Sequence, residues 1–356
     1  MAEALNFTYQ ALPMRVVFGA GSVASLPDEV SRLGLRRVLV LSTPEQEDTA
    51  SRVAAALGDH VAGVHAKARM HVPVEVAAEA RQVATDLGAD GCVAVGGGST
   101  IGLGKAIALE YGLPIVAVPT TYAGSEMTPV WGLTEGGQKR TGRDSRVLPH
   151  AVVYDPELTV SLPTGLSATS GINAIAHAVE ALYAPDASPI ISLMAEEGAR
   201  ALASALPSVV AAPEDIEARG EALYGSWLCG SCLGATTMSL HHKLCHALGG
   251  SFDLPHAETH TVVLPYALAY NAPAALPAVA ALNRALGSGD PARALFELTG
   301  RLGAPRSLRA LGFPADGIER VVEQVTATPY ANPRAVTPDG VRELLRSALD
   351  GTPPVG

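Results

Sequence analysis

The segment VAVGGGSTIGLGKAIAL, Val93–Leu109, decides the fold. Its apolar start predicts a buried strand that ends at Val95, three glycines follow, and the remainder has the composition of a helix. Only glycine lets a backbone approach a phosphate closely, and a new helix presents free N–H groups and the positive end of its dipole at the same place. The segment therefore predicts a pyrophosphate cradle, although a tight strand-to-helix turn would also need glycine. The residues of this cradle are Gly96, Gly97, Gly98 and Ser99.

Short β-branched runs alternate with Ala-rich helical patterns around that segment. Strands are expected within residues 36–43, 60–65, 91–96 and 114–119. This rhythm predicts a Rossmann-like parallel sheet in an α/β dinucleotide-binding domain. After Asp155-Pro156, long Ala, Leu, Glu and Arg stretches predict an all-α second part. Because Pro163 and Gly165 mark the change of pattern, we expect an α/β domain over residues 1–160 and a helical domain over residues 161–356.

Composition excludes several functional classes. With 356 residues, 48% hydrophobic and 17% charged, the chain has material for two folded domains, and no apolar run approaches the length of a membrane span. A net charge of −10 argues against binding to nucleic acids or anionic membranes. The N-terminal sequence MAEALNFTYQ does not resemble a signal peptide, so we expect a cytoplasmic protein. The four cysteines are expected to be small buried side chains.

Polar residues follow the next predicted strand. The segment PTTYAGSEMT places Thr120, Thr121 and Ser125 at the carboxyl edge of the sheet, where open α/β sheets bind ligands. A Thr pair is also an ordinary way to end a strand. The cationic stretch QKRTGRDSR contains Arg140 and is either a solvated loop or part of a site for anionic groups.

A second concentration of polar residues lies in the helical part, in NAIAH, HHKLCH and LPH. Asn173 and His177 stand four residues apart and share one face of a helix, as do His242 and His246. One such His is usually a hydrogen-bonded core residue, but so many in one short stretch are not easily all structural. The crowded imidazoles are His241, His242, His246, His256 and His260.

The glycine segment, PTT…GSE, DPELT and the Asn/His series together resemble the iron-containing alcohol dehydrogenase superfamily over nearly the whole chain. Within it, LHHKLCHALGG, LPHAETH and NPRAVTPDG resemble the maleylacetate reductase subgroup. The resemblance implies a dehydroquinate synthase-like fold, with an N-terminal dinucleotide-binding domain, a helical C-terminal domain, an active site in the cleft between them, and a homodimer.

Two departures from the metal-using relatives bear on the chemistry. Those relatives hold their ion with an Asp and three His, at positions matched here by Asn173, His177, His242 and His256. Because a neutral amide is a poor ligand for a divalent transition metal, we expect catalysis without a metal, although three His can still bind zinc. NAD-selective relatives often end the first strand with an Asp, whereas this chain has Ser42, so NADH and NADPH both remain open as cofactors.

The resemblance implies hydride transfer from NAD(P)H to the carbon–carbon double bond of maleylacetate, giving 3-oxoadipate in the degradation of aromatic compounds. Hydride addition leaves an enolate on the ketone oxygen, and a proton must reach the adjacent carbon. We expect His246 as proton donor or oxyanion partner, His242 as the second choice, and His177 and Lys243 in the same catalytic group. The dicarboxylate substrate is expected to bind Asn173, His241, His256 and Lys243. Arg140 is expected to face the nicotinamide or a cofactor phosphate.

Three alternatives remain. A metal-dependent alcohol or polyol dehydrogenase predicts stoichiometric zinc or iron, and a dehydroquinate-synthase type predicts bound NAD that is not consumed. Both would favour a carboxylate where Asn173 stands. A non-catalytic nucleotide sensor predicts cofactor binding without turnover.

Overall fold

The computed structural model describes residues 7–9, 11–12, 14–136 and 138–354, without the side chains of Gln138 and Lys139. Most of the N-terminal segment that suggested a cytoplasmic protein, residues 1–6 and 10, lies outside that part. The chain divides into two compact units. The sheet unit comprises Leu12–Leu162 and Glu214–Leu223, and the helical unit is formed mainly by Pro163–Pro213 and the residues from Tyr224 onward.

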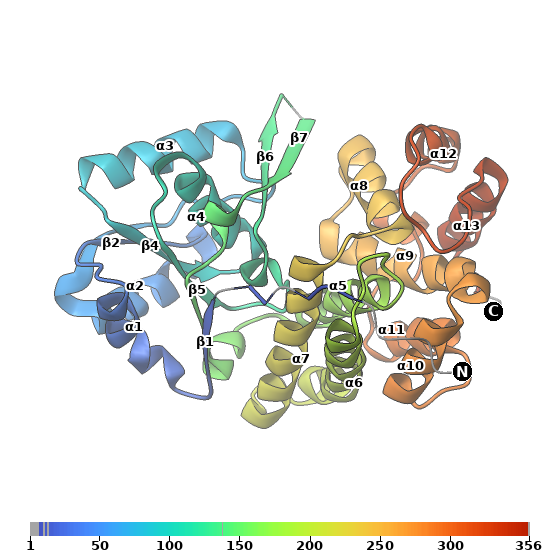
Figure 1. Ribbon diagram of the computed structural model, residues 1–356, viewed down its shortest axis with the longest axis horizontal. Coiled ribbons are helices and arrows are strands. Elements are labelled where there is room, and N and C mark those ends of the chain that lie inside the picture. The colour runs from blue at the N-terminus through green and yellow to red at the C-terminus, as the bar shows by residue number, and fades with distance from the viewer. Residues whose placement is uncertain (1–6, 10, 13, 137, 355–356) are drawn as a thin grey trace. The chain divides into compact units, whose positions relative to one another are not determined.

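The sheet unit contains, within the described residues, a six-stranded parallel sheet of order β1-β8-β5-β4-β2-β3 (Figure 1). Its strands are β1 (Arg15–Phe18), β2 (Val38–Leu41), β3 (Val61–His65), β4 (Gly91–Gly96), β5 (Ile115–Pro119) and β8 (Ala151–Tyr154). An antiparallel hairpin of β6 (Val130–Glu135) and β7 (Gln138–Arg143) follows β5. The register that pairs Gly96 with Pro119 places the carboxyl ends of β4 and β5 side by side.

Helices cover both faces of this sheet (Figure 1). They are α1 (Leu26–Arg32), α2 (Glu47–Leu57), α3 (Val74–Asp86) and α4 (Gly98–Tyr111). Alternate strand residues point to opposite faces. Val38 and Val40 therefore pack in a core with α1 and α2, whereas Leu39 and Leu41 pack with α3 and α4.

The helical unit is built from nine helices of the described chain. They are α5 (Thr164–Leu182), α6 (Pro189–Ala211), α7 (Ile216–Ala235), α8 (Leu240–Phe252), α9 (His256–Asn271), α10 (Leu276–Leu286), α11 (Pro291–Arg301), α12 (Ile318–Thr326) and α13 (Pro338–Asp350). Several begin with a capping side chain followed by proline, as Ser188 does for α6 and Thr337 for α13. Leu240, Leu244 and Leu248 form one apolar stripe of α8 and pack in a core with α9, α12 and α13.

The first residues of α7 belong to the sheet unit for a local reason. Arg219 is completely buried and donates to the hydroxyl of Tyr122 (3.2 Å) and to the carbonyl of Leu162 (3.3 Å). A buried guanidinium must be hydrogen-bonded, so this residue fixes Glu214–Leu223 to the sheet unit.

The predicted α/β part and helical part are confirmed, as are the four predicted strands. A further strand that the sequence did not predict, the edge strand β1, precedes these four. That strand is only four residues long, and it is stabilised by pairing with β8, more than a hundred residues later in the sequence. In the described chain, no helix has both the length and the apolar character needed to cross a bilayer.

Candidate active site

The glycine segment joins β4 to α4 through a turn that has little room for side chains. A Cβ on Gly96, where φ is 154°, would lie 2.4 Å from Oγ1 of Thr100, and one on Gly97 would lie 2.8 Å from Cγ2 of Thr121. A Cβ on Gly98 would meet nothing within 4 Å. Helix α4 begins at Gly98, and its N-cap residue, Gly97, has no side chain to cap the N–H groups of the first turn. The turn thus offers open space and N–H donors at Gly98 and Ser99, as a phosphate cradle requires.

Two of the predicted hydroxyl residues lie at this turn. The Thr120 N–H donates to the carbonyl of Gly96 (3.2 Å), and the Thr120 hydroxyl accepts from Nε2 of Gln46 (2.7 Å). Thr121 packs directly against Gly97. Ser125 lies further along, in a 3-10 turn formed by Ser125–Met127, and its carbonyl is held by a side chain from α4.

Two other predicted cofactor residues are placed differently. Ser42 follows β2 and is fully buried, and its hydroxyl has no hydrogen-bond partner within the described part of the chain. Arg140 lies on the β6–β7 hairpin, with its side chain 73% exposed and its guanidinium 3.7 Å from the carboxylate of Glu135. The structure therefore does not bring Arg140 into the group at the glycine turn.

In the helical unit, α5, α8 and α9 carry the imidazoles. A buried carboxylate that the sequence reasoning missed organises them: Glu180 of α5, fully buried. Its oxygens accept the backbone N–H groups of Ser239 (2.7 Å) and His241 (2.8 Å), so that it caps the first turn of α8. The same carboxylate lies 2.7 Å from Nδ1 of His242.

A chain of hydrogen bonds runs from Glu180 through two imidazoles. Because a carboxylate only accepts, Nδ1 of His242 carries the proton and its Nε2 has a lone pair. That Nε2 lies 3.0 Å from Nδ1 of His177, which must then be the donor. Any second proton on His177 sits on Nε2. In this arrangement a second proton on His177 would be stabilised by a buried carboxylate two residues along the hydrogen-bond chain.

A second imidazole pair supports the first. Nε2 of His241 lies 3.0 Å from Nδ1 of His260, and both rings are completely buried. Burial, followed by the neighbouring imidazoles, holds the pKa of each well below its usual value of 6.5. Both are therefore neutral. His241 was expected to bind a substrate carboxylate, but an inaccessible, neutral ring is better suited to supporting His242, whose ring centroid lies 5.3 Å away.

The remaining predicted residues have mixed surroundings. Asn173 lies one turn before His177 on α5 and is 3% exposed, and its amide oxygen has no hydrogen-bond partner among the described residues. His256 begins α9 and is half-buried, with its ring centroid 4.3 Å from that of His260. His246 is exposed, and its centroid lies 6.2 Å from that of His242.

Lys243 is exposed and leads to a second residue that the sequence reasoning missed. Its Nζ lies 5.3 Å from the ring centroid of Tyr330, in the segment that follows α12. The Tyr330 hydroxyl is buried and has no hydrogen-bond partner in the described part of the chain. Burial, and then the charge of Glu180, raise the pKa of this hydroxyl. Tyr330 therefore remains a neutral donor close to the Glu180 carboxylate.

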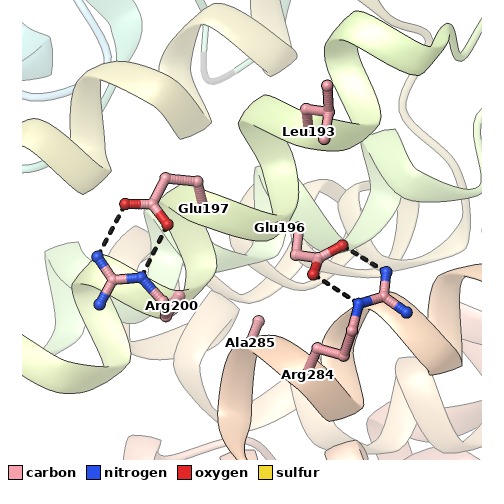
Figure 2. Close-up of a pocket in the computed structure, with 6 residues that line it drawn as sticks. All are labelled: Leu193, Glu196, Glu197, Arg200, Arg284 and Ala285. Atoms are coloured by element: carbon pink, nitrogen blue, oxygen red, sulfur yellow. Dashed lines mark hydrogen bonds and ion pairs between the residues drawn. The ribbon is translucent and has the colours of Figure 1, made fainter.

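A surface pocket between α6 and α10 lacks comparable chemistry (Figure 2). Its charged residues pair with one another: Arg284 with Glu196 at 2.6 and 2.8 Å, and Arg200 with Glu197 at 2.7 and 2.8 Å. The charges of such exposed pairs neutralise each other, and the pairs contribute little to stability. We therefore place the candidate active site at the imidazole cluster.

Two family profiles cover most of the chain. The family described as "Iron-containing alcohol dehydrogenase" matches residues 13–156, and the one described as "Fe-containing alcohol dehydrogenase family, C-terminal" matches residues 167–349. The chain belongs to the iron-containing alcohol dehydrogenase family. It is 58% identical to maleylacetate reductase from Sphingobium indicum over 99% of both chains. It is 57% identical to maleylacetate reductase from Burkholderia cepacia over 98% of this chain and 99% of the relative.

Solved structures of the family have the same fold. The crystal structure of maleylacetate reductase from Agrobacterium tumefaciens superimposes with a TM-score of 0.95 at 53% identity, over 99% of this chain and 100% of that one. A 1,3-propanediol oxidoreductase is more distant, with a TM-score of 0.90 at 26% identity over 97% and 100% of the two chains.

The family name implies iron, but the donors present fit that ion poorly. The positions that match the ligands of metal-using relatives hold an amide and three imidazoles, so no anion among these four would offset a buried divalent charge. Glu180 already accepts from two backbone N–H groups and from His242. His241, Cys245 and His260 also offer ligand atoms within 4.8 Å of one another. However, burial and the Glu180 charge raise the pKa of the Cys245 thiol and so disfavour the thiolate that would bind a metal.

Proposed function

We propose that this chain reduces the carbon–carbon double bond of maleylacetate to give 3-oxoadipate, with NADH or NADPH as the hydride donor and without a metal. The observation that carries the proposal is the Glu180–His242–His177 chain beside Asn173, in a protein 51–58% identical to named maleylacetate reductases. A buried carboxylate that supports an imidazolium takes the place of a metal as the source of positive charge.

The proposed reaction moves one hydride and one proton. The hydride leaves C4 of the dihydronicotinamide and bonds to the alkene carbon that is β to the ketone, and NAD(P)⁺ forms. The alkene electrons move to give an enolate on the ketone oxygen. The adjacent carbon then takes a proton and the ketone returns, so that atoms and electrons balance.

His177 is the proposed proton donor. With Nδ1–H bonded to His242, its second proton occupies Nε2, and Glu180 stabilises the resulting charge through His242. This replaces His246, which the sequence favoured but which lies exposed at the margin of the cluster. We propose that His246 and the half-buried His256 contact the substrate but do not transfer the proton.

Asn173 and Lys243 are the proposed donors to the substrate oxygens. The amide O and N of an Asn are told apart only by their partners, so the partnerless position at Asn173 can equally present NH₂ to a carboxylate or an enolate oxygen. Lys243 supplies a positive charge for the second carboxylate, and the Tyr330 hydroxyl supplies another donor nearby.

The cofactor is proposed to bind with its pyrophosphate at Gly97, Gly98 and Ser99. Because Ser42 stands where NAD-selective relatives carry an Asp, no carboxylate there repels the 2′-phosphate of NADPH. We further propose a cytoplasmic homodimer. The four cysteines, which are buried free thiols in the structure, suit a reducing compartment.

The test is the initial rate of NADH and NADPH oxidation with freshly made maleylacetate, on metal-analysed protein before and after exhaustive chelation. Turnover that resists the chelator is the expected result. Activity that disappears and returns with zinc or iron would instead support a metal-dependent dehydrogenase. Tight NADH binding without turnover would support a nucleotide sensor, and light scattering on the same sample gives the oligomeric state.

A further inference from the structure

We infer that Lys105 is a positioning residue for the cofactor: its buried side chain ties α4, the helix that starts at the glycine turn, to the Ser125–Val130 segment. The inference rests on the proposed function in one respect, namely that NAD(P)H binds at the glycine turn. It adds a residue that does not touch the ligand but determines whether two ligand-facing segments keep their spacing.

The contacts of Lys105 are unusually complete for a lysine. The side chain is 1% exposed. Its Nζ donates to the carbonyls of Ser125 (2.7 Å), Thr128 (2.8 Å) and Val130 (2.8 Å), and lies 2.9 Å from the Thr128 hydroxyl. These acceptors span six residues of one segment. A single ammonium therefore holds the whole stretch between the Ser125 turn and the start of β6.

The segment has bonds of its own, from the Thr128 N–H (3.2 Å) and hydroxyl (3.0 Å) to the Ser125 carbonyl and from the Asp144 N–H to the Pro129 carbonyl (2.9 Å), but its hydrogen bonds to α4 come from Lys105. Apart from the 3-10 turn Ser125–Met127, it has no regular structure before Val130 among the described residues. Three carbonyls gathered around one point repel each other unless a cation lies between them, and a buried carbonyl that loses its donor is destabilising. Without Lys105, the segment should move away from α4.

A buried acidic side chain on the same segment acts on this charge, although burial raises its own pKa. Glu126 is 1% exposed and accepts from the hydroxyl of Tyr154 (2.8 Å) at the end of β8. Burial lowers the pKa of Lys105 to about 7, and the Glu126 charge opposes this shift. The three carbonyl acceptors also favour the protonated form, because an ammonium has three donors and a neutral amine has two.

Position in the chain connects this anchor to the cofactor. Lys105 lies on the helix whose first turn forms the proposed pyrophosphate cradle, within two turns of Gly98. Its first acceptor is Ser125, a proposed cofactor contact. The anchor therefore sets the distance between the N–H groups of α4 and the Ser125 hydroxyl, and both must be in place before the cofactor arrives.

The experiment compares Lys105→Met with Arg81→Met. Arg81 also donates to α4, to the Ala106 carbonyl (2.9 and 3.0 Å), but it links that helix to α3 and not to the Ser125–Val130 segment. Lys105→Met should raise the Kd of NADH about tenfold, because it removes the buried ionic hydrogen bonds that hold the Ser125–Val130 segment on α4. The kcat at saturating NADH should change far less. Amide exchange should accelerate within residues 124–130. Arg81→Met should lower the melting temperature without raising the Kd.

The outcomes separate this inference from the proposed function. Equal Kd values for both variants, or a fall in kcat at unchanged Kd, would overturn the positioning role. Wild-type protein that binds NADH but leaves maleylacetate unreduced would overturn the function alone, whereas no binding of NADH at all would overturn both. If Lys105→Met fails to fold, Thr128→Val removes the hydroxyl that accepts from Lys105 (2.9 Å) and donates to the Ser125 carbonyl (3.0 Å). It should weaken NADH binding in the same direction, and an unchanged Kd there would overturn the inference.

Discussion

The two buried polar networks of this protein differ in how completely their atoms are paired. Around Lys105, one ammonium meets three carbonyls and a hydroxyl, and Glu126 meets Tyr154. In the imidazole cluster, by contrast, Oδ1 of Asn173, Nδ1 of His241 and Nε2 of His260 have no hydrogen-bond partner among the described residues. Fully paired networks hold a backbone in place, whereas the unpaired amide oxygen of Asn173 is accounted for by a ligand that binds there. The Lys105 network therefore holds backbone segments in place, whereas the imidazole cluster is where we expect the reaction.

The largest expected effect comes from replacing His177, the last imidazole of the Glu180–His242–His177 chain. His177→Asn removes the proposed proton donor and should lower kcat about 10²- to 10⁴-fold, the usual contribution of general acid catalysis. Stopped-flow rates of NADH oxidation with maleylacetate give the measurement. His150→Asn, at an exposed position of the sheet unit, is the control. A kcat within threefold of wild type would remove His177 from the mechanism.

Glu180→Gln sharpens the same prediction. An amide can donate to Nδ1 of His242 and so reverse the tautomer, and outer partners of this kind are typically worth about 10- to 100-fold in activity. The loss should therefore be smaller than for His177→Asn. An equal or larger loss at an unchanged melting temperature would mean that Glu180 itself transfers the proton.

A change of similar size to that of Glu180→Gln is expected at the residue that distinguishes this site from metal sites. Asn173→Asp restores a carboxylate beside His177, His242 and His256. The affinity for Zn²⁺ should rise by about 10- to 100-fold, while reduction of maleylacetate should fall because an anion now faces the substrate carboxylates. Calorimetry with Zn²⁺ measures the first change and initial rates measure the second. Unchanged zinc affinity would show that geometry, not charge, excludes the metal.

Sequence reasoning succeeded where local pattern carries the information. The strand–glycine–helix rhythm at Val93–Leu109 and the spacing of Asn173 and His177 are readable because both depend on neighbours in the chain. It missed Glu180 and Lys105, because an acid in HAVEAL or a lysine in LGKAIAL is typical of an ordinary helix surface. Only the packing of α8 on α5, and of the Ser125–Val130 segment on α4, buries those charges. Short strands such as β1 were missed for the same reason, since their partners are remote in sequence.

Substitutions at two neighbouring glycines of the sheet unit should distinguish an effect on cofactor binding from an effect on folding. A methyl group at Gly98 meets nothing within 4 Å, whereas one at Gly97 would lie 2.8 Å from Thr121. Gly98→Ala should keep the melting temperature and weaken NADH binding about tenfold, because the methyl fills ligand space. Gly97→Ala should lower the melting temperature as well. Unimpaired NADH binding by Gly98→Ala would place the pyrophosphate elsewhere.

The smallest expected effect is a dependence of stability on acid, and it concerns the buried imidazole pair. The pKa values of His241 and His260 lie well below 6.5 in the folded protein. Below about pH 6.5 the unfolded chain takes up protons that the folded chain excludes, so the free energy of unfolding must fall as the pH falls, by at most about 1.4 kcal/mol per pH unit for each ring. His260→Asn should show a shallower fall between pH 6.5 and 5 in urea unfolding. Leu264→Ala, in the same helix, is the control, because it should lower the free energy of unfolding by the same amount at every pH in that range. If the free energy of unfolding of His260→Asn falls with pH as steeply as that of Leu264→Ala, the folded cluster accepts protons and holds a charge at His260.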